Sequence, residues 1–233
     1  MNVLVTGGPA WEPIDGMRRL TNASTGALGA RLAGALAAAG HRVTFLRGEL
    51  ASAVVPVVPV GMLETLPFGT NDDLSRRLEE WPDRGAIGAV FHAAALCDFR
   101  VAAARLADGT DCAAAKIPTR SGRVILELEP ATKVLARLRA WFPGARLVGW
   151  KYELNGTRTD ALAAAWRQLE EARTDACVLN GRAWGGGFAL CEPPDRVVPF
   201  GDGAALAAGL VRWLETGPFP GARDHQETGT GST

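Results

Sequence analysis

Short apolar runs alternate with longer amphipathic segments along most of the chain. Runs typical of buried strands cover residues 3–5, 43–46, 89–95, 146–150, 176–179 and 196–199. Segments with helical spacing lie between or after them, at residues 26–39, 71–81, 132–141, 158–173 and 203–215. Strands that alternate with helices indicate an α/β fold. We therefore predict a Rossmann-like, doubly wound, mostly parallel sheet in a single domain, residues 1–216, with an inserted loop or strap.

The remaining segments are less regular. Residues 54–60 are rich in valine but carry two prolines, which predicts an edge strand or an extended connection. Residues 99–115 are predicted to form a loop with a helical turn, and residues 123–129 a half-exposed strand. Asn71 is the predicted cap of its helix. Residues 217–233 lack any apolar period and are predicted to be a disordered tail.

The loop after the first strand is unusually long for this kind of fold. A dinucleotide-binding turn passes from strand to helix in a few residues, whereas here the polar segment runs from Gly7 to a helix start near Gly26. Gly7 and Gly8 allow close backbone approach, and Ser24 lies just before a helix N-terminus that attracts anions. These residues favour a phosphate site, with ordinary helix capping by Ser24 or Thr25 as the alternative.

The same opening loop carries other candidate groups. The Asn22 amide could orient a carboxylate or acyl oxygen, or simply form an Asx-turn. Glu12 and Asp15 could act as an acid and a base. Because Arg18 and Arg19 lie close by and no histidine or cysteine does, a structural ion network is favoured.

Three polar clusters follow predicted strands, at residues 6–25, 96–100 and 149–153, and are expected at the carboxyl edge of the sheet. Asp98 could bind Mg²⁺ or a ribose hydroxyl, or could cap a helix. Lys116 stands among apolar residues and could meet a phosphate or lie in solvent. His92, inside an apolar strand, is predicted to be a hydrogen-bonded core residue.

Composition narrows the range of partners. The 233 residues contain 25 Lys and Arg against 25 Asp and Glu, so the balanced charge disfavours binding to nucleic acid or to anionic membranes. The four cysteines show no zinc spacing and are predicted to be free. We see neither a secretory leader nor an apolar run of spanning length, and expect a cytoplasmic protein without membrane contact.

In this order, the motifs resemble the phosphopantothenoylcysteine synthetase family, the carboxyl-terminal domain of the bacterial bifunctional coenzyme A flavoprotein and its monofunctional relatives. The likeness covers about residues 1–215 and rests on these segments: VLVTGG, EPID with Arg18 and Asn22, GALG, HAAALCDF, Ala115-Lys116-Ile117, Val148-Gly149-Trp150, Asp175 to Asn180, and GGGF.

The resemblance implies a ligase that activates 4′-phosphopantothenate with CTP or ATP, releases pyrophosphate and joins cysteine through an amide bond. It implies that Asn22 and Lys116 are catalytic, and that Arg18, Asn22 and Asn180 bind substrate. Residues implied at the nucleotide are Gly7, Gly8, Ser24, Gly26, Ala94, Asp98, Lys133, Val134 and Trp150. Mg²⁺ near Asp98 and a homodimer are also implied.

Some positions depart from the family pattern. Two lysines usual on the helix before the Asp175 strand are replaced by Gln168 and Ala172, while Lys133 stands where an acid is usual. The sequence therefore also allows a non-catalytic nucleotide-binding relative. An NAD(P)-dependent oxidoreductase on the same sheet is the other alternative, which the missing G-x-G-x-x-G turn disfavours.

Overall fold

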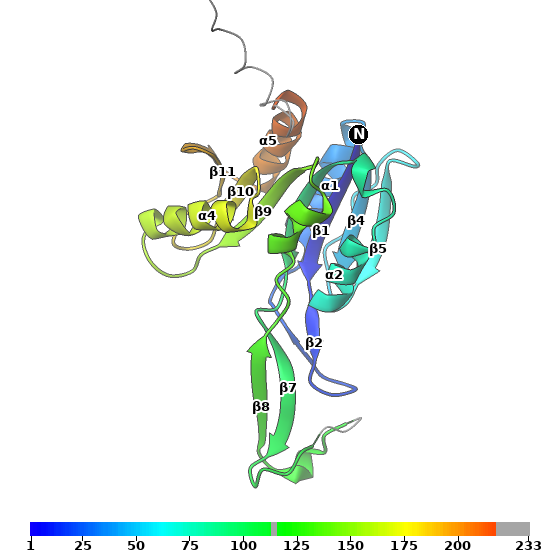
Figure 1. Cartoon of the computed structure of the whole chain (residues 1–233), viewed down its shortest axis with the longest axis vertical. Coiled ribbons are helices and arrows are strands. Elements are labelled where there is room, and N and C mark those ends of the chain that lie inside the picture. Colours follow the sequence, from blue (N-terminus) through cyan, green and yellow to red (C-terminus); the bar gives the residue numbers. More distant parts are fainter. Residues whose placement is uncertain (113–115, 218–233) are drawn as a thin grey trace, which may run out of the picture.

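The computed structural model describes residues 1–112 and 116–217. Eight strands form one sheet in the order β12-β11-β10-β9-β6-β1-β4-β5 (Figure 1). The strand bounds are β1 (Asn2–Pro9), β4 (Arg42–Gly48), β5 (Leu63–Phe68), β6 (Ile87–Ala95), β9 (Arg146–Tyr152), β10 (Ala176–Asn180), β11 (Phe188–Glu192) and β12 (Arg196–Phe200). The strands from β5 to β10 run parallel, and β11 and β12 are antiparallel.

The central strand β1 is buried along nearly its whole length, as its continuous apolar run predicts. Val5 pairs in register with Phe45 of β4 on one side and with Phe91 of β6 on the other. The chain first moves outward from β1 to β4 and β5, then returns to place β6 on the opposite side. Strand order therefore reverses between β1 and β6, where ligands of doubly wound folds bind.

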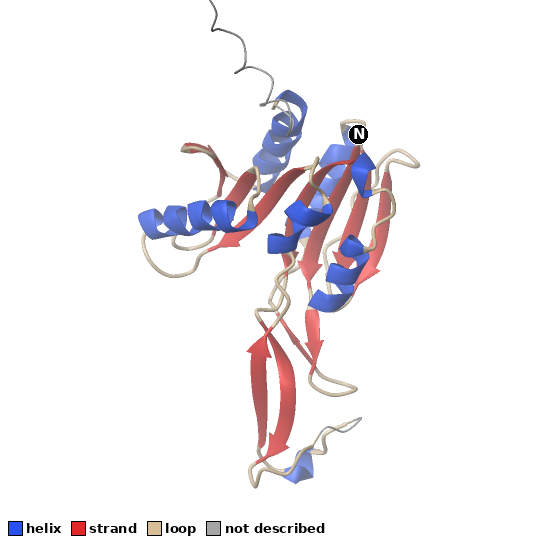
Figure 2. Cartoon of the chain, in the orientation of Figure 1, coloured by secondary structure: helices blue, strands red, loops and turns tan. Residues whose placement is uncertain are grey.

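Helices cover both faces of the sheet (Figure 2). On one face, α1 (Ala27–Ala38) and α5 (Gly203–Thr216) pack against a core that includes Val5, Phe45 and Phe91. The other face carries three helices, α2 (Asn71–Glu79), the single turn α3 (Leu138–Trp141) and α4 (Arg158–Ala172). Short 3₁₀ turns lie at η1 (Arg84–Ala86), η2 (Thr119–Ser121) and η3 (Leu135–Arg137).

Two small antiparallel pairs project beyond the carboxyl edge of the sheet (Figure 1). In the opening loop, β2 (Trp11–Pro13) pairs with β3 (Arg19–Thr21). Farther along the chain, β7 (Phe99–Leu106) pairs with β8 (Val124–Pro130). We call residues 99–130 the strap. The predicted α/β sheet and its inserted strap are thus confirmed.

The loop predicted over residues 99–115 is wrong for its first half, which forms β7. Three consecutive alanines gave this segment little strand signal. Its pairing with β8 supplies the hydrogen bonds instead, with Val101 opposite Leu128. The predicted strand over 123–129 is confirmed as β8. Residues 113–115 lie outside the described part of the chain.

Three other local predictions need correction. Residues 54–60 form an extended connection, which was the second of the two options, and the edge strand β5 follows them. The helix predicted over 132–141 is reduced to η3 and α3. Thr70, and not Asn71, caps α2, since Thr70 Oγ1 accepts a hydrogen bond from Asp73 N. The prediction of a disordered tail falls on residues 218–233, outside the described residues.

Candidate functional site

The end of β1 meets the start of α1 through glycines. Gly8 and Gly26 both have positive φ, +86° and +76°. A Cβ on Gly26 would lie 3.0 Å from Gly8 Cα, and a Cβ on Gly7 would lie 2.9 Å from Gly29 Cα. The helix begins after Gly26 without a side-chain cap from that residue and without an acidic side chain in its first turn. Its positive end is therefore open to an anion beside the glycine backbone.

The hydroxyls before α1 contribute little to capping. Ser24 Oγ accepts from Gly26 N at 3.3 Å, and Thr25 Oγ1 accepts from Ala27 N at 3.4 Å. Both contacts are long for such hydrogen bonds. Ser24 and Thr25 thus bond backbone N–H groups at this end of α1, although neither is its N-cap residue, which is Gly26.

Asn22 joins the opening loop to the loop after β6. Its Nδ2 donates to the Leu96 carbonyl at 2.7 Å. This partner is 74 residues away. Ser24 N, the usual donor of a local Asx-turn, pairs with the Asn22 backbone carbonyl at 2.9 Å instead of with the side chain. In the same region, Thr6 Oγ1 accepts from Ala94 N at 3.3 Å. The first two polar clusters predicted from the sequence thus meet at the carboxyl edges of β1 and β6.

Asp98 and Lys133 form an ion pair at this edge. Both side chains are exposed, and the Asp98 carbonyl accepts from Ala131 N at 2.9 Å where the strap returns to the sheet. Val134, the next residue after Lys133, is buried against α2 and α3. The ion pair brings together two segments, distant in sequence, that the family resemblance implies at the nucleotide.

Asp15 and Arg18 hold the segment that carries Lys116. Asp15 Oδ2 accepts from Ile117 N at 3.1 Å and from Arg18 Nη1 at 2.7 Å, while Arg18 Nη2 donates to the Ile117 carbonyl at 3.1 Å. The backbone hydrogen bonds from Ile117 and Met17 lower the pKa of Asp15. The predicted ion network is present for these residues. Lys116 lies exposed at the outer end of the opening loop, whereas Asn22 lies at its inner end.

Trp150 and Asn180 lie on the strands beyond β6. Trp150 packs against the core on the α1 and α5 face, opposite the face where Val134 is buried. Its indole Nε1 is buried and has no hydrogen-bond partner among the described residues. The Asn180 carbonyl accepts from Glu153 N at 2.9 Å. Among residues 1–112 and 116–217, no side-chain hydrogen bond or ion pair joins this third cluster to the other two.

Two of the positions that depart from the family pattern, Gln168 and Ala172, point into the protein. Gln168 Nε2 donates to Cys177 Sγ at 3.3 Å and lies 2.8 Å from where a Cβ on Gly149 would be. Ala172 is buried, with 4% of its surface exposed. Neither side chain provides a positive charge at the carboxyl edge.

Several buried titratable groups are structural. His92 Nδ1 lies 2.8 Å from Thr6 Oγ1, and burial lowers the His92 pKa to about 4, which confirms the core role predicted for it. All four cysteines are free. Burial raises the pKa of Cys97 to about 11, so its thiol stays protonated and unreactive at neutral pH.

Metal-ligating side chains are sparse. Within the described residues, no group of three or more His, Cys, Asp or Glu side chains is arranged to hold a metal ion. Asp98 is a single exposed carboxylate and is paired with Lys133. Mg²⁺ commonly binds through one or two carboxylates together with substrate phosphates, so Asp98 fits a metal that shares its ligands with a nucleotide and not one held by protein alone.

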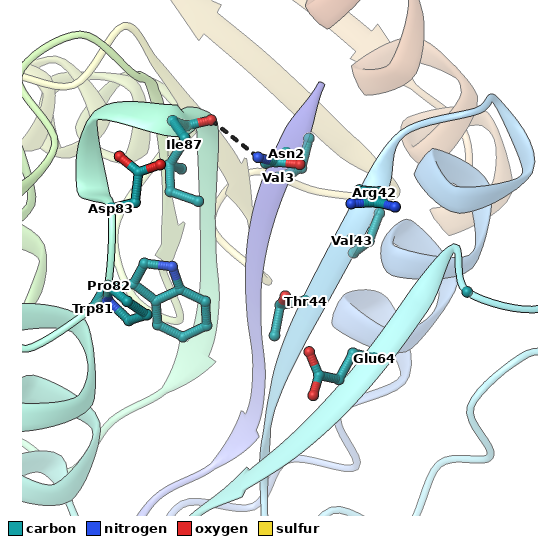
Figure 3. A pocket seen from close by; sticks show the side chains of 12 residues that line it. Asn2, Val3, Arg42, Val43, Thr44, Glu64, Trp81, Pro82, Asp83 and Ile87 are labelled. Carbon is teal, nitrogen blue, oxygen red and sulfur yellow. Dashed lines mark hydrogen bonds between the residues drawn. The ribbon is translucent and has the colours of Figure 1, made fainter.

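A cavity of about 320 Å³ lies at the opposite, amino edge of the sheet (Figure 3). It is lined by Thr44 and Glu64 on neighbouring strands, with Trp81 and Asp83 facing them. It shares no lining residue with the site at the carboxyl edge. In the described part of the chain, no helix is long and apolar enough to cross a membrane.

The strand order defines a doubly wound α/β protein, and comparison with known proteins narrows that class. We call Gly7, Gly8 and Gly26, at the end of β1 and the start of α1, the glycine cradle. Residues 1–192 match the family model of the DNA/pantothenate metabolism flavoprotein C-terminal domain. The chain therefore belongs to this family, and its resemblance to phosphopantothenoylcysteine synthetase domains is confirmed.

Two curated relatives are both named coenzyme A biosynthesis bifunctional protein CoaBC. The one from Thermococcus kodakarensis is 32% identical over 179 residues, which cover 76% of this chain and 40% of the relative. The one from Mycolicibacterium smegmatis is 31% identical over 185 residues, which cover 77% and 42%. The chain thus spans less than half the length of these relatives.

Solved structures share the fold. A DNA/pantothenate metabolism flavoprotein from Streptococcus pneumoniae superposes with a TM-score of 0.81 at 21% identity, covering 92% of this chain and 98% of that one. A Cab2 variant in complex with phosphopantothenate-cysteine superposes with a TM-score of 0.71 at 20% identity, covering 92% and 85%.

Proposed function

We propose that this chain is a phosphopantothenate–cysteine ligase. One observation carries the proposal: the opening loop meets the carboxyl ends of β1 and β6 through the hydrogen bond between Asn22 and Leu96. The chain that makes this contact belongs to the family named above. A long loop on a nucleotide-binding edge can hold an acyl substrate beside a nucleotide. The Cab2 complex with phosphopantothenate-cysteine, a protein of the same fold, supports the same substrate class.

The proposed reaction has two steps. A carboxylate oxygen of 4′-phosphopantothenate attacks the α-phosphorus of CTP or ATP, and pyrophosphate leaves as the acyl-nucleotide forms. The amine of cysteine then attacks the acyl carbon, loses a proton, and displaces the nucleoside monophosphate to give the amide. No side-chain nucleophile is needed, so positioning and electrostatic stabilisation carry the catalysis.

The nucleotide would occupy the edge around the glycine cradle. Gly7, Gly8 and Gly26 leave room for phosphate oxygens at the positive end of α1, with Ser24 beside them. On the other side of the switch point, Ala94, Asp98 and Lys133 would complete the site. Trp150 is proposed to pack beside the base and Val134 to support Lys133 from the core.

Asn22 and Lys116 are the proposed catalytic residues. Asn22 is held by Leu96 and would orient the acyl group through its amide. Lys116 would place its ammonium group at the α-phosphate, where negative charge develops during activation. Arg18 and Asn180 are proposed to bind phosphopantothenate. Mg²⁺ bound with the nucleotide would neutralise phosphate charge, with Asp98 as its one protein carboxylate.

A homodimer is proposed because the strap exposes apolar side chains on both of its strands. Phe99 and Leu128 are each about half exposed, and the pairing of Val101 with Leu128 places them on the same face of a ribbon of only two strands. Such a ribbon is marginal alone and gains stability when a further surface covers it. A second copy of the chain would cover these side chains and bring its strap close to the site. Sedimentation of the wild-type chain and of a Leu128→Lys variant tests this, with a monomeric wild type as the contrary result.

The activity itself is tested by supplying 4′-phosphopantothenate and cysteine with CTP, ATP, GTP or UTP in the presence of Mg²⁺. Pyrophosphate and the amide product are measured together. We expect turnover with CTP or ATP that requires both other substrates. Omission of cysteine should leave one equivalent of acyl-nucleotide. Absence of pyrophosphate with every nucleotide would overturn the proposed function.

A second candidate is a relative that binds a nucleotide without turning it over. Gln168 and Ala172 favour it, because both are directed into the protein and add no charge at the carboxyl edge. Nucleotide-dependent stabilisation against heat, together with no pyrophosphate release, would distinguish this candidate from the ligase.

A further inference from the structure

Asn71 is a buried polar residue that helix capping does not explain. It is the first residue of α2, and only 1% of its surface is exposed. Thr70 already caps the helix. Burying an amide is unfavourable unless its donors and acceptor find partners, so the partners of Asn71 indicate what it is there to hold.

The Asn71 amide pairs with both backbone groups of Cys97. Oδ1 accepts from Cys97 N at 3.1 Å, and Nδ2 donates to the Cys97 carbonyl at 2.7 Å. Nδ2 also donates to the Thr132 carbonyl at 3.1 Å. Because one partner is an N–H and two are carbonyls, only one orientation of the amide satisfies all three. A single side chain therefore ties together two loops that are distant in sequence.

Each of these loops presents its charged group at the next position. Asp98 follows Cys97, Lys133 follows Thr132, and the two form the ion pair at the carboxyl edge. Both side chains are more than half exposed, at 72% and 65%. An exposed ion pair contributes little free energy, so it cannot fix its own position. The backbone beneath it must do so, and Asn71 is the buried group that binds that backbone on both sides.

A second contact from the start of α2 reinforces the first. Thr132 Oγ1 donates to Asp72 Oδ1, and Asp72 directly follows Asn71. The backbone N–H of Asn71 also faces Glu12 Oε1 in the opening loop, at 3.4 Å. The beginning of α2 thus contacts three segments of the candidate site, none of which is adjacent to it in sequence.

We propose that Asn71 is a positioning residue for the nucleotide, which holds Asp98 and Lys133 at the spacing that the nucleotide requires. This inference rests on the proposed function and adds to it a residue outside the recognised motifs. Asn71 is buried and acts through the two loops without touching the nucleotide. Loss of the Asn71 amide should therefore weaken the binding of the nucleotide. Binding of phosphopantothenate, which is proposed to occur near Arg18 and Asn22, should be nearly unaffected.

The test compares four variants of the full chain. Asn71→Asp keeps the shape but turns the Nδ2 donor into an acceptor facing two carbonyls. Asp72→Ala removes the exposed contact to Thr132 together with an exposed ion pair to Arg100, whose charged atoms lie 3.8 Å apart. Leu74→Ala and Ser75→Ala are the matched controls, because both residues are buried on α2 and, in the described part of the chain, neither side chain is hydrogen-bonded to either loop. CTP and ATP binding is measured by titration, and the KM of each substrate by pyrophosphate release.

We expect Asn71→Asp to raise the nucleotide Kd and KM about tenfold, with the phosphopantothenate KM changed by less than about twofold. Asp72→Ala should raise the nucleotide KM by about two- to threefold in a stably folded protein. Leu74→Ala should lower the melting temperature and leave the nucleotide Kd unchanged. Ser75→Ala should leave both unchanged.

The outcomes separate the two proposals. An active wild type whose nucleotide Kd is unaltered by Asn71→Asp, or by Asp72→Ala if Asn71→Asp does not fold, overturns the positioning role alone. Equal losses for nucleotide and phosphopantothenate, or a raised nucleotide Kd in Leu74→Ala, also overturn it, because general destabilisation would then be sufficient. A wild type that releases no pyrophosphate with any nucleotide overturns the ligase and this inference together.

Discussion

Asp15 and Ile117 lie 102 positions apart, yet the Asp15 carboxylate accepts a hydrogen bond from the Ile117 backbone N–H at 3.1 Å. Arg18, which is ion-paired with Asp15, donates to the Ile117 carbonyl at 3.1 Å. The opening loop therefore satisfies both backbone groups of Ile117. Since Lys116 directly precedes Ile117, this contact holds the backbone from which the side chain of the proposed catalytic lysine extends.

Loss of this contact should free the strap segment around Lys116. In Asp15→Asn, Oδ1 can still accept from the backbone N–H groups of Met17 and Arg18. The amide nitrogen that replaces Oδ2 cannot accept from Ile117 N or from Arg18 Nη1. We expect trypsin to cleave after Lys116 about tenfold faster than in the wild type, because cleavage reports local opening. The cleavage rate is measured by mass spectrometry at low protease concentration.

Asp108→Asn is the matched control for this experiment. Asp108 lies in the strap turn, where it accepts a local hydrogen bond from Thr110 N at 2.9 Å and a second one from the Thr110 side chain. Its substitution should leave cleavage after Lys116 unchanged. Equal rates of cleavage after Lys116 in the wild type and in Asp15→Asn would show that the contact between Asp15 and Ile117 does not hold the strap.

Burial of His92 should make the free energy of unfolding depend on pH. The His92 pKa is lowered to about 4, whereas an unfolded histidine titrates near 6.5. Between these values the unfolded chain binds a proton that the folded chain does not, so stability falls as the pH decreases from 6.5 toward 4. The His92 contribution should make unfolding about 2 kcal/mol easier at pH 5 than at pH 7.

Urea unfolding at pH 5 and pH 7 measures this dependence. His92→Gln keeps a hydrogen-bonding side chain beside Thr6 but cannot titrate. The variant should reduce the difference in the free energy of unfolding between pH 5 and pH 7 by about 2 kcal/mol. Other groups titrate in both proteins and cancel in the difference. If the free energy of unfolding changes equally with pH in the wild type and in His92→Gln, the His92 pKa is not depressed in the folded state.

Much of the sheet is predictable because its strands are short apolar runs with clear boundaries. In β1, Leu4 and Val5 point to opposite faces and both are buried, so the sequence shows a continuous run that is typical of a central parallel strand. The ion network of Asp15 and Arg18 is likewise visible as neighbouring opposite charges. These features depend on residues that are close together in the sequence.

The features that the sequence did not predict depend on contacts between distant segments. In β7, Val101 and Ala104 gain their structure from pairing with β8, and nothing in the local pattern announces that partner. Asn71 has the residue type and place of a helix cap, and the partners of its side chain become apparent only in three dimensions. The roles proposed for the site residues remain predictions, which the next experiments test.

Gly8→Ala should damage both stability and nucleotide binding. Gly8 has φ of +86°, and a Cβ there would lie 2.7 Å from Ala51 Cβ and 3.2 Å from Gly48 N. Positive φ alone costs an alanine about 1 kcal/mol, and the contacts require the backbone beside α1 to shift in addition. We expect a lower melting temperature and at least tenfold weaker binding of the nucleotide by titration.

Gly61→Ala separates the two effects. Gly61 has a similar φ of +82°, but a Cβ there would meet nothing within 4 Å. This variant should lose about 1 kcal/mol of stability and bind the nucleotide as the wild type does. Nucleotide affinity that falls equally in both variants would argue against a glycine cradle at Gly8.

Asn22 and Lys116 should act in different steps of the proposed reaction. Lys116→Gln removes the charge that would stabilise the α-phosphate, so we expect pyrophosphate release to fall at least about 100-fold.

Asn22→Asp replaces the donor to the Leu96 carbonyl with a carboxylate. Negative charge beside the acyl group should slow attack by cysteine, so the acyl-nucleotide should accumulate after one turnover. Quenched reactions resolved by mass spectrometry would measure both species. Asn155→Asp, which alters the same residue type as Asn22 at an exposed position just after β9, serves as a control and should retain full activity. Full activity in Lys116→Gln or in Asn22→Asp would remove that residue from its proposed role.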